Sequence, residues 1–134
     1  MTSSHNRLPL SSTAIATLVT MGAVYWFAAA LVVRWTAANW VSNNAATGLV
    51  FGLIIVVTLP ALMLGMRLAS VARDRAQLSA TIMTGTALLL DGVALTWGLP
   101  LYGTDSAIVL GGAASIMWGA GVALTLGIVL EQRA

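Results

Sequence analysis

One acidic side chain lies deep within a long apolar stretch of the sequence, and its carboxyl group is the one best placed to do chemistry. Asp91 comes about seven residues before the end of the stretch from residue 77 to 99, or roughly 10 Å at 1.5 Å per residue. A carboxylate near the centre of a membrane helix costs about 3 kcal/mol, so such residues face other helices and are paired, protonated or functional. Asp91 is therefore the first candidate for a polar site inside the membrane.

At a similar depth, other apolar stretches supply side chains that could bond the Asp91 carboxyl. Tyr25 and Trp26 bring a phenol and an indole N–H, while Ser115 and Trp118 bring a hydroxyl and a second indole. A carboxyl hydrogen-bonded to Tyr25, to Ser115 or to an indole would hold its helix against the neighbouring helices.

Two further interpretations of Asp91 stay open. Arg34, at the end of the first apolar stretch, has a long side chain that could reach inward and form an ion pair with Asp91. Alternatively, Asp91 could load and release a proton or a cation as part of a transport site.

Other reactive groups are nearly absent from the sequence, which argues against several classes of protein. The chain has no Cys and no Lys, and its single histidine, His5, lies near the N-terminus. There is thus no thiolate or cysteine metal site, no lysine for a Schiff base, and no histidine in an apolar stretch to ligate haem. Phosphate-binding glycine loops are absent as well. We expect a protein that is not an enzyme and has neither cofactor nor metal.

The composition predicts the elements that position Asp91. Hydrophobic residues make up 59% of the 134 residues and charged residues 7%, whereas a soluble domain has about 25% charged residues. Four apolar stretches, at about 12–33, 45–68, 77–99 and 107–130, are long enough to cross a hydrocarbon core of about 30 Å as helices. The prediction is a single all-α transmembrane domain over residues 1–134, an up-down-up-down four-helix bundle with consecutive helices as neighbours. The first stretch exceeds the apolar region of a signal peptide, so we expect it to be a span.

The arginines predict which end of the bundle faces the cytoplasm. Five of them fall on one side of a four-span arrangement: Arg7, Arg67, Arg73, Arg75 and Arg133. Only Arg34 falls on the other side, so the positive-inside rule places both termini in the cytoplasm. Aromatic residues gather at the opposite boundary, as interfacial residues do: Trp35, Trp40, Trp97 and Tyr102.

Small residues predict where the helices approach one another. Lipid gives helices no hydrophobic reason to associate, so they depend on close backbone contact and polar groups. Along 77–99, a helical period places one small face (Ala80, Thr84, Ala87, Asp91, Ala94, Gly98) opposite a large apolar face (Ile82, Leu89, Val93). The glycines expected at helix contacts are Gly48, Gly52, Gly65, Gly98, Gly111, Gly112 and Gly119.

The second half of the chain resembles small four-span bacterial membrane proteins that are classed as domains of unknown function. Three segments carry the resemblance: Leu90-Asp91-Gly92, Trp97-Gly98-Leu99-Pro100-Leu101-Tyr102-Gly103, and Ser115-Ile116-Met117-Trp118-Gly119. The resemblance implies a four-span fold in a bacterial cytoplasmic membrane, and importance for Asp91 and the turn at 100–103. It implies no activity.

Three functions are consistent with these patterns. The favoured one is a structural or accessory subunit whose small faces pack against transmembrane helices of other polypeptides or of a second copy. The second is a small proton- or cation-coupled transporter or channel centred on Asp91. The third is a protein that binds lipid, quinone or pigment, with Tyr25, Trp26, Phe51 and Trp118 supplying aromatic surface. The arginines are too scattered to predict a nucleic-acid partner.

Overall fold

The structure is a computed structural model that describes residues 9–134; the predictions for His5 and Arg7 lie outside these residues. Within the described part, all regular structure is helical. The long helices are α1 (Ser12–Thr36), α2 (Asn44–Leu68), α3 (Ala76–Trp97) and α4 (Ser106–Gln132), with short 3-10 helices η1 (Ala37–Asn39), η2 (Arg73–Arg75) and η3 (Leu99–Leu101). All four long helices are long and apolar enough to cross a membrane, so the chain has the architecture of a multi-pass membrane protein.

Side-chain caps explain where three of the helices begin. The side chains of Ser11, Asn43 and Asp105 each accept hydrogen bonds from main-chain N–H groups in the first turn of α1, α2 and α4, as N-cap residues do. The predicted spans match the observed helices to within about three residues, the scatter expected of helix ends. The third helix ends at Trp97, two residues before the predicted end, and Gly98 is its C-cap, with an N–H that donates to the Ala94 carbonyl oxygen at 2.7 Å.

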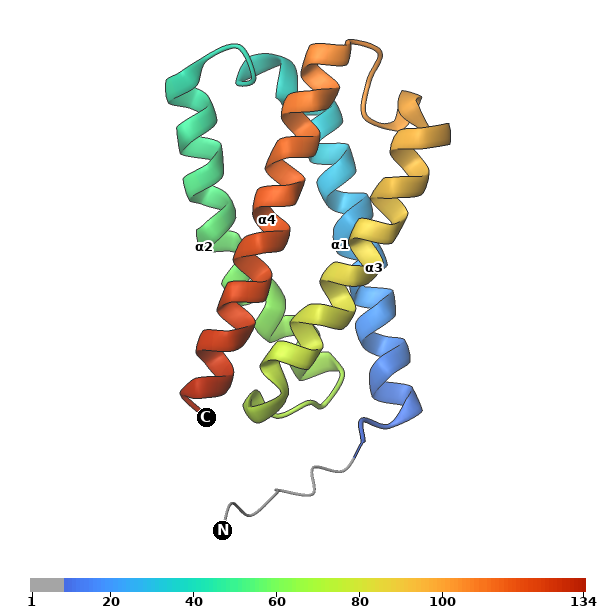
Figure 1. Ribbon diagram of the computed structural model, residues 1–134, viewed down its shortest axis with the longest axis vertical. Helices are drawn as coiled ribbons and strands as arrows, with labels where there is room; N and C mark the ends of the chain where they lie inside the picture. The colour runs from blue at the N-terminus through green and yellow to red at the C-terminus, as the bar shows by residue number, and fades with distance from the viewer. Residues whose placement is uncertain (1–8) are drawn as a thin grey trace.

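The order of the helices in space differs from their order along the chain. Figure 1 shows α1 beginning at the end of the molecule where α4 ends, with the α2–α3 connection at that same end. The α3 helix packs along α1 and α4, and α4 packs along α2, whereas α2 makes few contacts with α1 or α3. The prediction that all consecutive helices are neighbours is therefore wrong for α1 with α2 and for α2 with α3.

Close glycine contacts explain why α3 lies between α1 and α4. A Cβ atom added at Gly22 of α1 would lie 2.5 Å from the main-chain oxygen of Met83 in α3. One added at Gly127 of α4 would lie 2.8 Å from the Ala80 Cβ, also in α3. Both glycines let helix backbones approach more closely than any side chain permits. Neither is among the glycines predicted at helix contacts.

The glycines predicted at helix contacts fall into two groups. Four lie against side chains of other segments: Gly65 against Met83, Gly111 against Val41, Gly112 against Val33, and Gly119 against Ile54. The other three make no close contact with another element. A Cβ at Gly48 or Gly52 would meet nothing within 4 Å, and one at Gly98 would meet only Ala94 of its own helix. For Gly48, Gly52 and Gly98, the predicted helix contact is therefore absent within the described chain.

The two faces of α3 are close to those predicted. Ala80, Thr84 and Asp91 are buried, whereas Leu89 is 76% exposed on the opposite face. Ile82 is the exception, since it is partly buried against the core near the ends of α1 and α4. A helix that packs on two neighbours, as α3 does, buries a wider stripe of its surface than a helix that packs on one.

Candidate functional site

Three side chains from separate segments form a closed hydrogen-bonded cluster around Asp91, which is 5% exposed. Its Oδ1 accepts hydrogen bonds from Trp26 Nε1 of α1, at 2.9 Å, and from the Tyr102 hydroxyl. Trp26 Nε1 also donates to the Tyr102 hydroxyl oxygen, at 3.1 Å. We call Trp26, Asp91 and Tyr102 the Asp91 cluster. It joins α1, α3 and the connection that leads to α4.

Tyr102 belongs to this cluster and not to the predicted aromatic boundary. It follows η3 and is 1% exposed, because the connection between α3 and α4 folds back into the bundle. Gly103 has a φ of +123°, a conformation that side chains disfavour, and it turns the chain toward α4. Burial raises the pKa of the Tyr102 phenol, and the hydrogen bond to Asp91 raises it further. The phenol therefore keeps its proton and acts as a donor.

The other predicted partners of Asp91 bond elsewhere. The Tyr25 hydroxyl donates to the Ala61 carbonyl oxygen of α2 at 2.9 Å, and the Ser115 hydroxyl donates to a carbonyl of its own helix, at Gly112. Adjacent residues on a helix point about 100° apart, so Tyr25 faces α2 when Trp26 faces Asp91. Of the hydrogen bonds proposed from the sequence, the one to an indole N–H is present.

Arg34 and Trp118 also lie away from the Asp91 cluster. Arg34 donates to the Pro100 carbonyl oxygen at 2.6 Å, so the predicted ion pair with Asp91 is not formed. Trp118 donates to the Phe51 carbonyl oxygen at 3.1 Å, and the two rings lie 5.5 Å apart. Both side chains bond main-chain carbonyl groups of other segments, and these contacts connect α1 with η3 and α4 with α2.

The second oxygen of Asp91 is enclosed. Oδ2 is buried and has no hydrogen-bond partner in the part of the chain that the structure describes. Oδ1 is covered by its two donors. This arrangement is the one expected of a carboxyl group that holds helices together.

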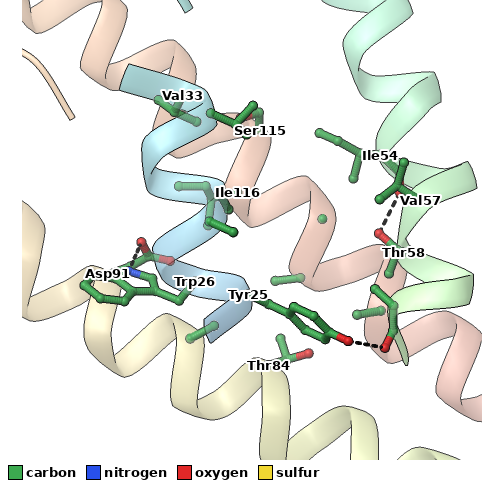
Figure 2. Close-up of a pocket in the computed structure, with 18 of the residues that line it drawn as sticks. Tyr25, Trp26, Val33, Ile54, Val57, Thr58, Thr84, Asp91, Ser115 and Ile116 are labelled. Carbon is green, nitrogen blue, oxygen red and sulfur yellow. Dashed lines mark hydrogen bonds between the residues drawn. The ribbon is translucent and has the colours of Figure 1, made fainter. Parts of the chain in front are cut away.

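Next to the Asp91 cluster is a cavity of about 690 Å³ that is partly open to the outside. All four long helices line it (Figure 2), and it separates the facing sides of α1 and α2, which make few contacts with each other. Its surface is almost entirely apolar. The polar residues in the lining, apart from the two indoles, are Tyr25, Thr36, Thr58, Thr84, Asp91 and Ser115. Its volume falls within the range of about 300–1,000 Å³ that is typical of small-molecule sites.

Thr84 is the polar lining residue without a protein partner. Threonines in helices commonly bond the carbonyl four residues earlier, as Thr58 does with Ile54 at 2.6 Å and Thr86 with Ile82 at 2.8 Å. The Thr84 hydroxyl makes no hydrogen bond to any residue in 9–134, although the side chain is only 8% exposed. Figure 2 shows it at the cavity wall below the Tyr25 ring. It is a hydrogen-bonding group available to a molecule in the cavity.

No family model, curated protein or solved structure matches this chain. The resemblance to four-span bacterial membrane proteins stays a prediction. The features of this chain that bear on its function are the Asp91 cluster and the cavity beside it.

Proposed function

We propose that this chain is a non-enzymatic membrane protein that takes up an uncharged, lipid-like molecule in the cavity between α1 and α2. The observation that supports this function best is the cavity itself. It combines the volume of a small-molecule site with an apolar lining and a partial opening along helices that are apolar enough to contact lipid. A molecule dissolved in the bilayer would fill it without giving up contact with an apolar medium.

The lining indicates the chemistry of the occupant. No arginine lines the cavity, and Asp91 has one oxygen bonded to Trp26 and Tyr102 and the other buried. A phosphate or an ammonium group would therefore lose its hydration without gaining a partner, which is costly. A neutral molecule with an apolar body and one carbonyl or hydroxyl group fits better, with Thr84 as its hydrogen-bond partner. The rings of Tyr25 and Trp26 offer surface for stacking, which favours a quinone among the neutral lipids.

We also propose how the chain is placed in the membrane. The chain would cross the cytoplasmic membrane of a bacterium in an up-down-up-down arrangement with both termini in the cytoplasm. Four described arginines support this orientation, because they belong to the α2–α3 connection and to the ends of α2 and α4: Arg67, Arg73, Arg75 and Arg133. The positive-inside rule assigns such an end to the cytoplasm.

Filling the cavity tests the proposed function. Ala120 lines the cavity from α4, whereas Ala114 of the same helix is exposed outside it. Ala120→Phe is expected to weaken binding of the soluble quinone decylubiquinone about 5- to 150-fold, because the phenyl ring would overlap the bound molecule and such overpacking costs about 1–3 kcal/mol. Ala114→Phe is the matched control and is expected to bind like the unchanged protein. Native mass spectrometry in a mild detergent measures the bound fraction, and equal binding by the two variants would refute the proposal.

Removing the Thr84 hydroxyl tests the polar contact. Thr84→Val keeps the shape of the side chain and removes one neutral hydrogen bond, so decylubiquinone is expected to bind about two- to tenfold more weakly. Thr86→Val is the control, since that hydroxyl bonds its own helix at Ile82 and does not line the cavity. If Ala120→Phe prevents binding and Thr84→Val does not weaken it, the cavity binds the quinone without this contact.

A structural or accessory subunit is the second candidate, and one observation favours it. Gly48 and Gly52 of α2 form a GxxxG pair that has open space in front of it, as a surface for a partner helix requires. Extraction in mild detergent followed by native mass spectrometry would then recover other membrane polypeptides in fixed ratio. Gly52→Leu is expected to reduce that recovery and to leave decylubiquinone binding unchanged. Recovery of the chain as a monomer would contradict this second candidate.

A further inference from the structure

A second hollow lies at the end of the molecule where α2 finishes. Its volume is about 600 Å³, and it is lined by the second half of α2, the connection to η2, the first residue of η2 and one residue of α4. The lining residues are Pro60, Met63, Leu64, Met66, Arg67, Val71, Ala72, Arg73 and Leu130. We call it the α2-end pocket. Unlike the cavity between α1 and α2, it combines apolar residues with two positive charges.

The backbone turn after α2 brings these two charges into one pocket. Ser70 has a φ of 54°, in the left-handed region, and the Val71 N–H donates to the Met66 carbonyl oxygen at 2.9 Å. This geometry ends a helix and reverses the chain. Arg73 therefore returns to the side of α2 that carries Arg67, and both line the pocket.

The two arginines have no competing partner in the described chain. Both are exposed, and neither guanidinium has a hydrogen bond or ion pair with a residue in 9–134. Asp74 and Glu131, the acidic residues of the surrounding segments, have interactions of their own, and neither lines the pocket. An anion in the pocket would thus meet two guanidinium groups and no carboxylate.

We propose that the α2-end pocket binds one anionic phospholipid. Its phosphate would lie between Arg67 and Arg73, where charge-assisted bonds to guanidinium are strongest. An acyl chain would run along Pro60, Met63 and Leu64, which precede Arg67 on α2 by up to two helical turns toward the bilayer centre. Basic pockets beside membrane helices recognise lipid headgroups in this way. The apolar half of the pocket favours a lipid over free phosphate.

The test compares lipid binding to matched arginine variants by native mass spectrometry of the purified full chain. The double variant Arg67→Gln/Arg73→Gln is expected to bind phosphatidylglycerol about 10- to 30-fold more weakly than the unchanged protein. Each basic residue near an anionic lipid raises the binding constant about fivefold. Arg34→Gln/Arg133→Gln removes the same charge outside the pocket and is expected to bind as before. Phosphatidylcholine is expected to bind all three proteins equally and weakly.

Three results would overturn the proposal. Equal phosphatidylglycerol binding by the pocket variant and the unchanged protein would show that the arginines do not bind lipid. An equal loss in the control variant would show attraction by net charge alone. Displacement of the lipid by millimolar inorganic phosphate would indicate a site for free anions. Circular dichroism checks that the variants keep their helices, and decylubiquinone binding is expected to be unchanged because the two sites share no residue.

Discussion

Gly22→Ala is expected to lower the free energy of unfolding by about 1–3 kcal/mol, and Gly22→Leu by more, because the added atoms overfill a packed contact. The Cβ would lie 2.5 Å from the Met83 carbonyl oxygen and 3.0 Å from its Cα atom. Both are main-chain atoms, so no side-chain rotation can relieve the contact. The only relief is to move α1 away from α3, and this movement would also stretch the bonds of Trp26 to Asp91.

Gly121→Ala is the control for this substitution. Gly121 is exposed on α4, and a Cβ there meets nothing within 4 Å. Alanine favours a helix over glycine by about 1 kcal/mol, so this variant is expected to be as stable as the unchanged protein or more stable. The free energy of unfolding of both alanine variants is measured by dodecyl sulfate unfolding in mixed micelles, followed by circular dichroism. Equal stability of the two alanine variants would show that α1 and α3 are not in close contact at Gly22.

Asp91→Leu is expected to destabilise the protein by about 1–3 kcal/mol, because it leaves buried donors without an acceptor. Among residues 9–134, the Tyr102 hydroxyl would lose its acceptor, and Trp26 Nε1 would keep the Tyr102 oxygen alone. Asp91→Asn keeps Oδ1 but puts an N–H donor where Oδ2 has no partner, so it is expected to be destabilising as well. The measurement is the same dodecyl sulfate unfolding.

A double-mutant cycle separates the hydrogen bond from the packing. If Asp91 acts through Tyr102, then Asp91→Leu combined with Tyr102→Phe is expected to cost about 1 kcal/mol less than the sum of the single variants. Asp91→Leu with Thr96→Val is the control, since the Thr96 hydroxyl bonds its own helix at Gly92 and is exposed. Strict additivity of Asp91→Leu and Tyr102→Phe would contradict the coupling.

Local features of the structure could be predicted from local features of the sequence. Long apolar stretches predict the four helices because a helix satisfies its own backbone hydrogen bonds. Asn43 and Asp105 mark two of the starts because their side chains bond the first free N–H groups. The buried face of α3 follows from its 3.6-residue period, and burial of Asp91 on it follows from the cost of placing a carboxyl in lipid.

Features that depend on how the helices pack could not be predicted in this way. Gly22 and Gly48 are both glycines in apolar helices, yet only Gly22 lies against another backbone. Loop length suggested α2 as the neighbour of α1, but close contact at Gly22 places α3 there, and the cavity lies between α1 and α2. Tyr102 looked like a boundary residue because its burial depends on how the α3–α4 connection folds back.

The four spans, their approximate ends and the burial of Asp91 could thus be predicted, because they arise from interactions within one helix or between a residue and lipid. The donors that reach Asp91, the glycines that form contacts, and the positions of the cavity and the α2-end pocket become visible only in the folded structure. These features depend on side chains that are distant in the sequence, and hydropathy does not distinguish a helix surface that meets lipid from one that meets another helix, because both are apolar.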